Sequence, residues 1–220
     1  MQITEKLATP GEHPLFLQGM IGQLEAILTV PEQIHGNLVA ILGHPHSLQG
    51  GTMNNKVVTT LARTFKDLGI PSLRFNFRGV GQSEGVYDAG IGESEDMLAI
   101  AHGWQQENPY VQFIFAGFSF GSFVAYRAAS QCTNRLLITI APAIHHYNYQ
   151  ELTSNPYPWL IIQGEEDEVV PSELVFDFAR QAQPEIQVFH FAQTTHFFHG
   201  KLIELKARLT DYLLAQVLHI

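Results

Sequence analysis

The chain has 220 residues, of which 45 % are hydrophobic and 15 % are charged, and its formal net charge is −9. This length and composition fit one globular domain over residues 1–220 and exclude a disordered chain. Lysine and arginine form no cluster, which argues against nucleic acid as a partner. No apolar run approaches the roughly 20 residues of a membrane-spanning helix, and the N-terminus does not resemble a secretory signal. We therefore expect a cytoplasmic protein with no membrane partner.

Cys132 is the single cysteine, so the chain cannot form an internal disulfide. No histidine lies close to it in the sequence, and we interpret it as a small buried apolar residue rather than as a reactive thiol. The cysteine usage therefore gives no indication of an oxidising compartment.

Short apolar runs alternate with amphipathic segments, which predicts a mostly parallel sheet with helices on both faces. In chain order, the predicted strands are residues 15–18, 23–30, 38–42, 72–77, 111–116, 136–140, 159–163 and 186–191. The first two flank Gly19 and Gly22 and should pair as an antiparallel hairpin. Residues 38–42 (LVAIL) contain no polar side chain, as expected of a strand buried on both faces.

The predicted helices lie between these strands, at residues 53–68, 93–107, 119–130, 172–182 and 201–218. In the first of them Val57, Leu61 and Phe65 recur at helical spacing, and Gly69 ends the pattern. The sequence therefore predicts an α/β fold with about eight strands, in which ligands bind beyond the carboxyl ends of the strands.

The segment Gly117-Phe118-Ser119-Phe120-Gly121 follows one predicted strand and opens a predicted helix. It matches G-x-S-x-G, in which a serine occupies a tight strand-to-helix turn and flanking glycines relieve the crowding. Such a turn exposes the serine hydroxyl at the positive end of the helix, with the next backbone N–H directed toward a developing oxyanion. Ser119 is the predicted nucleophile and the Phe120 amide a predicted oxyanion donor. The alternative is an ordinary helix-capping serine.

A serine hydroxyl needs a general base near neutral pH, and the base needs an orienting acid. The loop after residues 159–163 reads GEEDEVVP, and in it we predict Asp167 as the acid because of its spacing from the strand. The three glutamates of this loop are interpreted as a solvated acidic face. Where the nucleophile lies on such a strand-to-helix turn, the three residues follow one another along the chain in the order serine, acid, histidine.

The base should follow the last strand, where His196 and His199 both occur. We favour His196 because of its position in the loop. His199 precedes the last predicted helix, and we expect it to cap that helix or to line the substrate pocket.

The loop after residues 38–42 begins Gly43-His44-Pro45-His46 and should supply the second oxyanion donor. Pro45 has no N–H, so the His46 amide is the predicted donor. His44 either contacts the substrate or braces the loop through hydrogen bonds.

Aromatic side chains near the strand ends indicate an apolar pocket, although core packing explains some of them equally well. They are Phe118, Phe120, Tyr147, Phe197 and Phe198. The side chains predicted to bind substrate are those of Phe118, Tyr147, His44 and His199.

Five segments together resemble the compact bacterial α/β-hydrolases related to dienelactone hydrolases: GHPHSLQGGTMNNKVV, LRFNFRGVGQSEG, GFSFGSFVA, QGEEDEVVP and THFFHG. The resemblance covers essentially the whole chain and implies an α/β-hydrolase fold with a Ser119, Asp167 and His196 triad. Dienelactone hydrolases proper carry a cysteine nucleophile where this chain has Ser119, so their substrate does not carry over. Residues 141–158 are too few to form the lid domain that larger members insert there, so we expect an open site.

The predicted function is a serine hydrolase that cleaves small or medium carboxylic esters or thioesters through an acyl-enzyme on Ser119. No metal or organic cofactor is expected, and the predicted protein is a monomer or a homodimer. A peptidase or amidase with the same triad and a non-catalytic binding protein remain as alternatives. A metal site is the third alternative, built from the histidines that follow strand ends, His44, His46, His145, His146, His196 and His199. The glycine-rich segment at 79–85 lacks the Walker lysine, so nucleotide binding is rejected.

Overall fold

The computed structural model describes residues 3–150, 156 and 158–218. Its eight strands form one sheet in the order β1-β2-β4-β3-β5-β6-β7-β8. The β1–β2 and β2–β4 pairs are antiparallel, and the other neighbouring strands are parallel. The strands are β1 (Gly11–Gln18), β2 (Gln23–Val30), β3 (Leu38–Gly43), β4 (Ser72–Phe75), β5 (Gln112–Phe118), β6 (Leu136–Ile140), β7 (Trp159–Gly164) and β8 (Gln187–Phe191).

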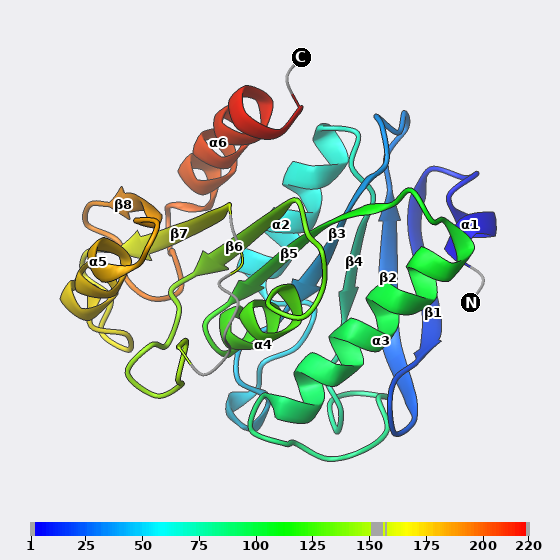
Figure 1. Cartoon of the computed structure of the whole chain (residues 1–220), viewed down its shortest axis with the longest axis horizontal. Coiled ribbons are helices and arrows are strands. Elements are labelled where there is room, and N and C mark those ends of the chain that lie inside the picture. The colour runs from blue at the N-terminus through cyan, green and yellow to red at the C-terminus, as the bar shows by residue number, and fades with distance from the viewer. Residues whose placement is uncertain (1–2, 151–155, 157, 219–220) are drawn as a thin grey trace.

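Helices cover both faces of this sheet (Figure 1). One apolar core lies between the sheet and α3, α4 and α5, and a second lies between the sheet and α2 and α6. The helices are α1 (Ile3–Lys6), α2 (Lys56–Asp67), α3 (Ile91–Glu107), α4 (Phe120–Ala129), α5 (Ser172–Gln181) and α6 (Leu202–Leu213), and a π-helical turn (Leu214–Leu218) continues α6.

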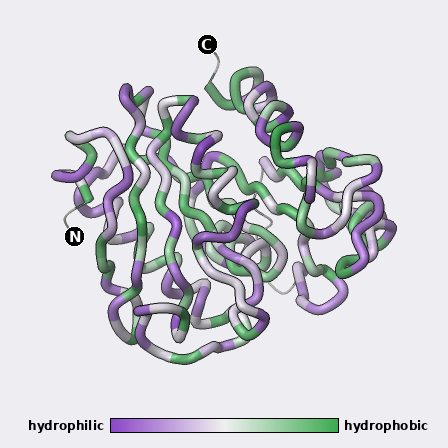
Figure 2. Tube along the Cα trace, turned by 180° about the vertical axis from the view of Figure 1, so that it is seen from behind, coloured by the Kyte–Doolittle hydropathy of each residue, from purple (hydrophilic) through white to green (hydrophobic). Residues whose placement is uncertain are grey.

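The central strands explain why two helical layers are needed. Strands β3, β6 and β7 are buried at every residue, and β5 at every residue except its first. Parallel strands joined by crossover helices are shielded on both faces, which is why these segments are almost continuously apolar. Seen from behind, the middle of the sheet is correspondingly hydrophobic, and hydrophilic residues dominate much of the periphery (Figure 2).

The α/β fold with eight mostly parallel strands is confirmed, and the differences from the sequence prediction lie at element ends. Strand β1 begins at Gly11 rather than at residue 15, and Pro14 is accommodated because β1 is an edge strand that needs fewer backbone donors. Strand β4 ends at Phe75 rather than at residue 77, because the Phe77 amide donates to the ring of His44 instead of to a neighbouring strand. The short helix α1 was not predicted.

The connection between β6 and β7 is the place where a lid would be inserted. Among residues 141–150, 156 and 158, which the structure describes there, no helix or strand forms. This agrees with the prediction that a lid domain is absent. None of the helices in the described part of the chain is long and apolar enough to cross a bilayer.

Candidate active site

Ser119 stands between β5 and α4 in a strained conformation, with φ 55° and ψ −117°. Residues other than glycine rarely adopt a positive φ, and where they do the strain is usually tied to function. The backbone around Ser119 is crowded: a Cβ on Gly117 would lie 2.0 Å from the Gly121 carbonyl oxygen, and a Cβ on Gly121 would lie 2.4 Å from the Gly43 carbonyl oxygen. Glycine is therefore required where the turn crosses the end of β3.

A buried serine directly after the motif, Ser122, holds this turn in place. The Ser122 hydroxyl lies 2.8 Å from the Gly117 carbonyl oxygen and 3.0 Å from the Ile140 carbonyl oxygen. The Ser119 amide donates to the same Ile140 oxygen at 2.8 Å. The turn is thus anchored to the end of β6 as well as to β5.

The structure brings Ser119, His196 and Asp167 into one hydrogen-bonded chain. His196 Nε2 lies 3.1 Å from Ser119 Oγ, and His196 Nδ1 lies 2.9 Å from Asp167 Oδ2. A carboxylate can only accept, so Nδ1 carries the proton and Nε2 is free to accept the serine hydroxyl proton. His196 is only 2 % exposed, which keeps water from competing for these bonds.

Asp167 is held by further donors besides the histidine. The Val169 and Val170 amides donate to Oδ1 at 2.9 and 2.7 Å, and Gln163 Nε2 donates to Oδ2 at 3.1 Å. Burial by itself would raise the pKa of Asp167, but the hydrogen bonds from His196, Val170 and Val169 outweigh it, and the pKa lies below its usual value. The carboxylate is therefore ionised at neutral pH.

The His196 imidazole is fixed by its surroundings. The Phe118 and Phe197 rings each lie 5.0 Å from it, measured between ring centroids. Its backbone N–H donates to the Glu168 carboxylate at 3.2 Å. These contacts hold the imidazole in the orientation that the hydrogen-bonded chain needs.

The loop after β3 is braced by His44, whose side chain is completely buried. Nδ1 donates to the Pro45 carbonyl oxygen at 2.6 Å, and Nε2 accepts the Phe77 amide at 3.0 Å. Burial lowers the pKa of His44 to about 4, so the ring is neutral at pH 7. His44 therefore ties the end of β3 to the end of β4.

His46 follows in the same loop and is half-buried. Nδ1 accepts the Leu48 amide at 3.2 Å, so Nε2 carries the proton and faces the Tyr87 hydroxyl at 3.2 Å. Burial lowers the pKa of His46 as well. Neither the His46 amide nor the Phe120 amide has an acceptor among the residues that the structure describes, so both N–H groups are available to a ligand.

The Phe120 side chain lies in an aromatic group beside Ser119. Its ring centroid is 5.0 Å from that of His46 and 5.6 Å from those of Tyr87 and Tyr147. Burial, and next a hydrogen bond with Tyr87, raise the pKa of Tyr147.

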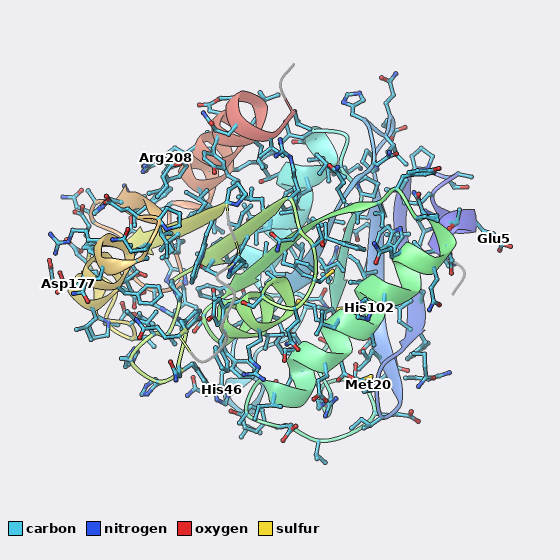
Figure 3. The ribbon with its side chains drawn as sticks, in the orientation of Figure 1. Glu5, Met20, His46, His102, Asp177 and Arg208 are labelled. Atoms are coloured by element: carbon cyan, nitrogen blue, oxygen red, sulfur yellow. The ribbon has the colours of Figure 1, made fainter. Side chains whose placement is uncertain are left out.

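In Figure 3 His46 lies at the lower edge of the molecule, at the opposite end from Arg208 of α6.

A small cleft of about 120 Å³ opens next to Ser119 and His196. One wall comes from the loop after β3 and the start of α2, and the other from the loops after β7 and β8. Its lining residues are Pro45, His46, Gln49, Gly50, Gly51, Asn55, Ser119, Val169, His196 and Phe197. A larger hollow of about 630 Å³ between α5 and β8 includes none of these residues.

Comparisons with known proteins identify relatives of this chain. No protein-family model matches it. An α/β serine hydrolase homologue from Coxiella burnetii is 42 % identical, with a TM-score of 0.88 over 93 % of this chain and 99 % of that one. The chain belongs to the α/β-hydrolase superfamily. At this coarse level it is a hydrolase.

Two further proteins place this α/β-hydrolase among its relatives. The structure of XC6422 from Xanthomonas campestris, described as a serine hydrolase without lid, is 37 % identical, with a TM-score of 0.89 over 94 % of this chain and 95 % of that one. The uncharacterised protein RP471 of Rickettsia prowazekii is 36 % identical over 186 residues, 80 % of this chain and 78 % of that protein. The relation to dienelactone hydrolases within the superfamily stays a prediction.

Two of the side chains predicted to bind substrate are instead buried inside this α/β-hydrolase. His44 and Phe118 are both completely buried. His44 uses both ring nitrogens to brace its loop. Phe118 points into the core on the α2 and α6 side and supports the His196 ring. Neither lines the cleft beside Ser119, but each positions residues that do.

Tyr147 and His199 lie at the periphery of the site. Tyr147 is half-buried beside Phe120, and its role in substrate binding stays a prediction. His199 is exposed, and its ring lies 6.0 Å from that of Phe197. It does not cap α6, whose N-cap is Lys201.

Six histidines were considered for a metal site. Among the described residues, no group of three or more His, Cys, Asp or Glu side chains could hold a metal ion. His44 is engaged in the core, and His145 stacks on His146 with 3.9 Å between ring centroids.

Cys132 was predicted to be buried. It is only half-buried, where it packs against the core, and this burial raises the pKa of its thiol.

Three residues of the α/β-hydrolase site were not singled out in the sequence. Ser122 holds the nucleophile turn, Gln163 donates to Asp167, and Asn55 lines the cleft. One signal could have identified Gln163, because a polar residue within the apolar run 159–163 needs a buried partner. Ser122 and Asn55 carry no such local signal.

Proposed function

We propose that this hydrolase cleaves small or medium carboxylic esters or thioesters through an acyl-enzyme on Ser119. The observation that carries the proposal is the hydrogen-bonded chain from Asp167 through His196 to Ser119 Oγ, with the serine on a strained turn. This arrangement makes a hydroxyl nucleophilic near neutral pH.

In the first half-reaction His196 Nε2 takes the hydroxyl proton as Ser119 Oγ attacks the carbonyl carbon. The Phe120 and His46 amides stabilise the negative charge that develops on the carbonyl oxygen. The tetrahedral intermediate then collapses, His196 gives its proton to the departing alcohol or thiol, and the acyl group stays on Ser119. Asp167 fixes the tautomer of the neutral imidazole and stabilises the imidazolium that forms.

In the second half-reaction a water molecule replaces the leaving group. His196 takes a proton from this water, the resulting hydroxide attacks the acyl carbon, and the second tetrahedral intermediate expels Ser119. The carboxylic acid is released and the serine regains its proton. All of these steps use side chains and amides of this chain, with no metal or organic cofactor as a participant.

The surroundings of Ser119 support a modest substrate size. The adjoining cleft has a volume of about 120 Å³, and the connection between β6 and β7 adds no helix over it in its described part. Typical pockets for drug-sized ligands measure roughly 300–1,000 Å³. A long acyl chain would therefore lie largely in solvent, which favours short and medium esters.

The test uses a fluorophosphonate probe and intact-protein mass spectrometry on the wild type and on Ser119→Ala, alongside hydrolysis of p-nitrophenyl esters of increasing chain length. We expect one probe adduct per wild-type chain, none on the variant, and a loss of turnover of at least about 10³-fold in the variant. A folded wild type that neither reacts with the probe nor hydrolyses any ester would overturn the proposal in favour of a binding protein. Hydrolysis of p-nitroanilides at rates similar to esters would favour the amidase alternative.

A further inference from the structure

The cleft beside Ser119 contains one carboxamide whose orientation is fixed. Asn55 is the N-cap of α2, and its Oδ1 accepts the Val57 amide at 2.9 Å. Only the oxygen end can accept from a backbone N–H, so the Nδ2 end of the carboxamide points away from the helix. No acceptor among the described residues contacts Nδ2, and Asn55 lines the cleft together with Ser119 and His196.

The wall that carries Asn55 favours hydrogen-bond acceptors for a second reason. Helix α2 has 12 residues, no acidic residue in its first turn, and Lys56 as its first residue. The N-terminus of a helix carries partial positive charge, and here no carboxylate neutralises it. Aspartate caps a helix as well as asparagine does, and its charge would suit the dipole, so helix stability alone does not account for the amide at position 55.

The facing wall has the opposite character. Val169 and Phe197 line it, and each is 43 % exposed although both are apolar. A substituent in this cleft therefore meets an N–H donor on one side and hydrocarbon on the other. With about 30 Å³ for each water-sized group, the cleft holds only about four such groups.

We propose that this cleft binds a short substituent of the ester that carries a hydrogen-bond acceptor, such as an ether, hydroxyl or carbonyl oxygen. The acceptor receives the Asn55 Nδ2 hydrogen bond, and the carbon atoms of the substituent pack against Val169 and Phe197. The substituent belongs either to the acyl group or to the alcohol of the substrate. This inference rests on the proposed function and narrows the substrate class.

The test compares isosteric esters that differ by one ether oxygen. In the acyl arm, p-nitrophenyl methoxyacetate is compared with p-nitrophenyl butyrate. In the alcohol arm, 2-methoxyethyl acetate is compared with n-butyl acetate, with acid release followed by pH-stat. The quantity measured is the ratio of kcat/KM for the ether ester to that for the hydrocarbon ester, so that a general loss of activity in a variant cancels.

The decisive variant is Asn55→Asp, which keeps a capping oxygen for α2 but replaces the donor with an acceptor. We expect the ratio to fall about 10-fold relative to the wild type in the arm whose substituent enters the cleft, because two acceptors then face each other. Asn55→Ser, which caps the helix but removes the donor, should lower the ratio about threefold. Asn54→Asp is the matched control: it adds the same charge at the adjacent exposed position, outside the cleft, and should leave both ratios unchanged.

The outcomes separate the two proposals. A wild type that hydrolyses these esters, combined with ratios that do not change in Asn55→Asp in either arm, overturns the cleft assignment and leaves the hydrolase proposal intact. An equal change in Asn54→Asp also overturns it, because the effect would then be long-range charge. A wild type that hydrolyses none of the four esters and reacts with no fluorophosphonate overturns both proposals.

Discussion

Two loops meet at Ser119, and they are held in place by different chemistry. The loop after β7 is held through the Asp167 carboxylate, which accepts from two backbone amides, from Gln163 and from His196. The loop after β3 is held through imidazoles: His44 ties it to β4, and His46 ties it to Tyr87. A carboxylate with a lowered pKa keeps its acceptor role to low pH, whereas an imidazole loses an acceptor nitrogen when it is protonated.

This difference separates the two loops in their response to acid. The pKa of Asp167 lies below its usual value, so its bonds persist until the pH falls below about 4. The loop after β3 responds to acid at higher pH, because the folded state keeps His44 neutral while an unfolded histidine binds protons at about pH 6.5. Acid therefore lowers the stability of the folded state through His44 before it affects Asp167.

Replacing the acid should have the largest effect. In Asp167→Asn the carboxamide oxygen stays on the Val169 and Val170 amides, so the NH2 group faces His196 Nδ1. The proton-bearing nitrogen then loses its acceptor, and the imidazole loses the charge that stabilises its protonated form. We expect kcat for p-nitrophenyl acetate to fall by about 10³- to 10⁴-fold with little change in KM. Steady-state kinetics test this, and circular dichroism melting checks the fold. A fall in kcat of less than about 10-fold would mean that Asp167 does not orient the base.

The buried imidazole should have the next largest effect, on stability. The pKa of His44 is about 4 when folded and near 6.5 when unfolded, so the unfolded state takes up the proton first as the pH falls. Stability is therefore lost between pH 6.5 and pH 4, and at about 1.4 kcal/mol per pKa unit the free energy of unfolding should drop by about 3 kcal/mol from this group.

Urea unfolding of the wild type and of His44→Gln at pH 7, 5.5 and 4.5 measures this contribution. The variant should be less stable at pH 7, because a buried hydrogen-bonded ring is replaced, but its stability should fall less steeply with acid. Contributions from the other histidines are common to both proteins and cancel in the comparison. Parallel curves for the two proteins would show that His44 does not control the acid response.

The smallest expected effect comes from the outer contact of the loop after β3. Tyr87→Phe removes the hydroxyl that faces His46 Nε2 at 3.2 Å and leaves the ring in its packing against Phe120. We expect kcat to fall about threefold, which corresponds to the loss of one neutral hydrogen bond. Tyr110→Phe is the matched control, since Tyr110 is 78 % exposed. A fall in kcat as large as that expected for Asp167→Asn would show that the two loops do not differ in this way.

The sheet and the order of the site residues could be predicted because both depend on local pattern. Buried parallel strands are read as apolar runs, and the residues that follow them gather at one edge of the sheet whatever the details of the loops. That is why the G-x-S-x-G motif could predict Ser119, and the positions of Asp167 and His196 after their strands could predict the other two residues. Strand β1 was only half predicted, because Pro14 interrupts the pattern and only its edge position makes it acceptable.

Side-chain direction could not be predicted in the same way. A motif places His44 and Phe118 next to the site along the chain, but whether each points to solvent or to the core depends on the twist and packing of the finished sheet. Both point inward. Asn55 shows the reverse case: its local spacing indicates only a helix cap, and the folded structure shows that this cap also lines the cleft.

The contact between Gly43, Gly117 and Gly121 has a consequence for how this enzyme can change its specificity. These glycines bring the ends of β3 and β5 and the start of α4 together through main-chain atoms alone, with residues 43 and 117 paired in the sheet. The ends of these three elements are thus held together by backbone contacts. The Val169 side chain, which lines the cleft but makes none of these contacts, can accordingly be randomised in a laboratory library without disturbing that backbone contact. Mutational tolerance should be high at Val169 and close to zero at the three glycines.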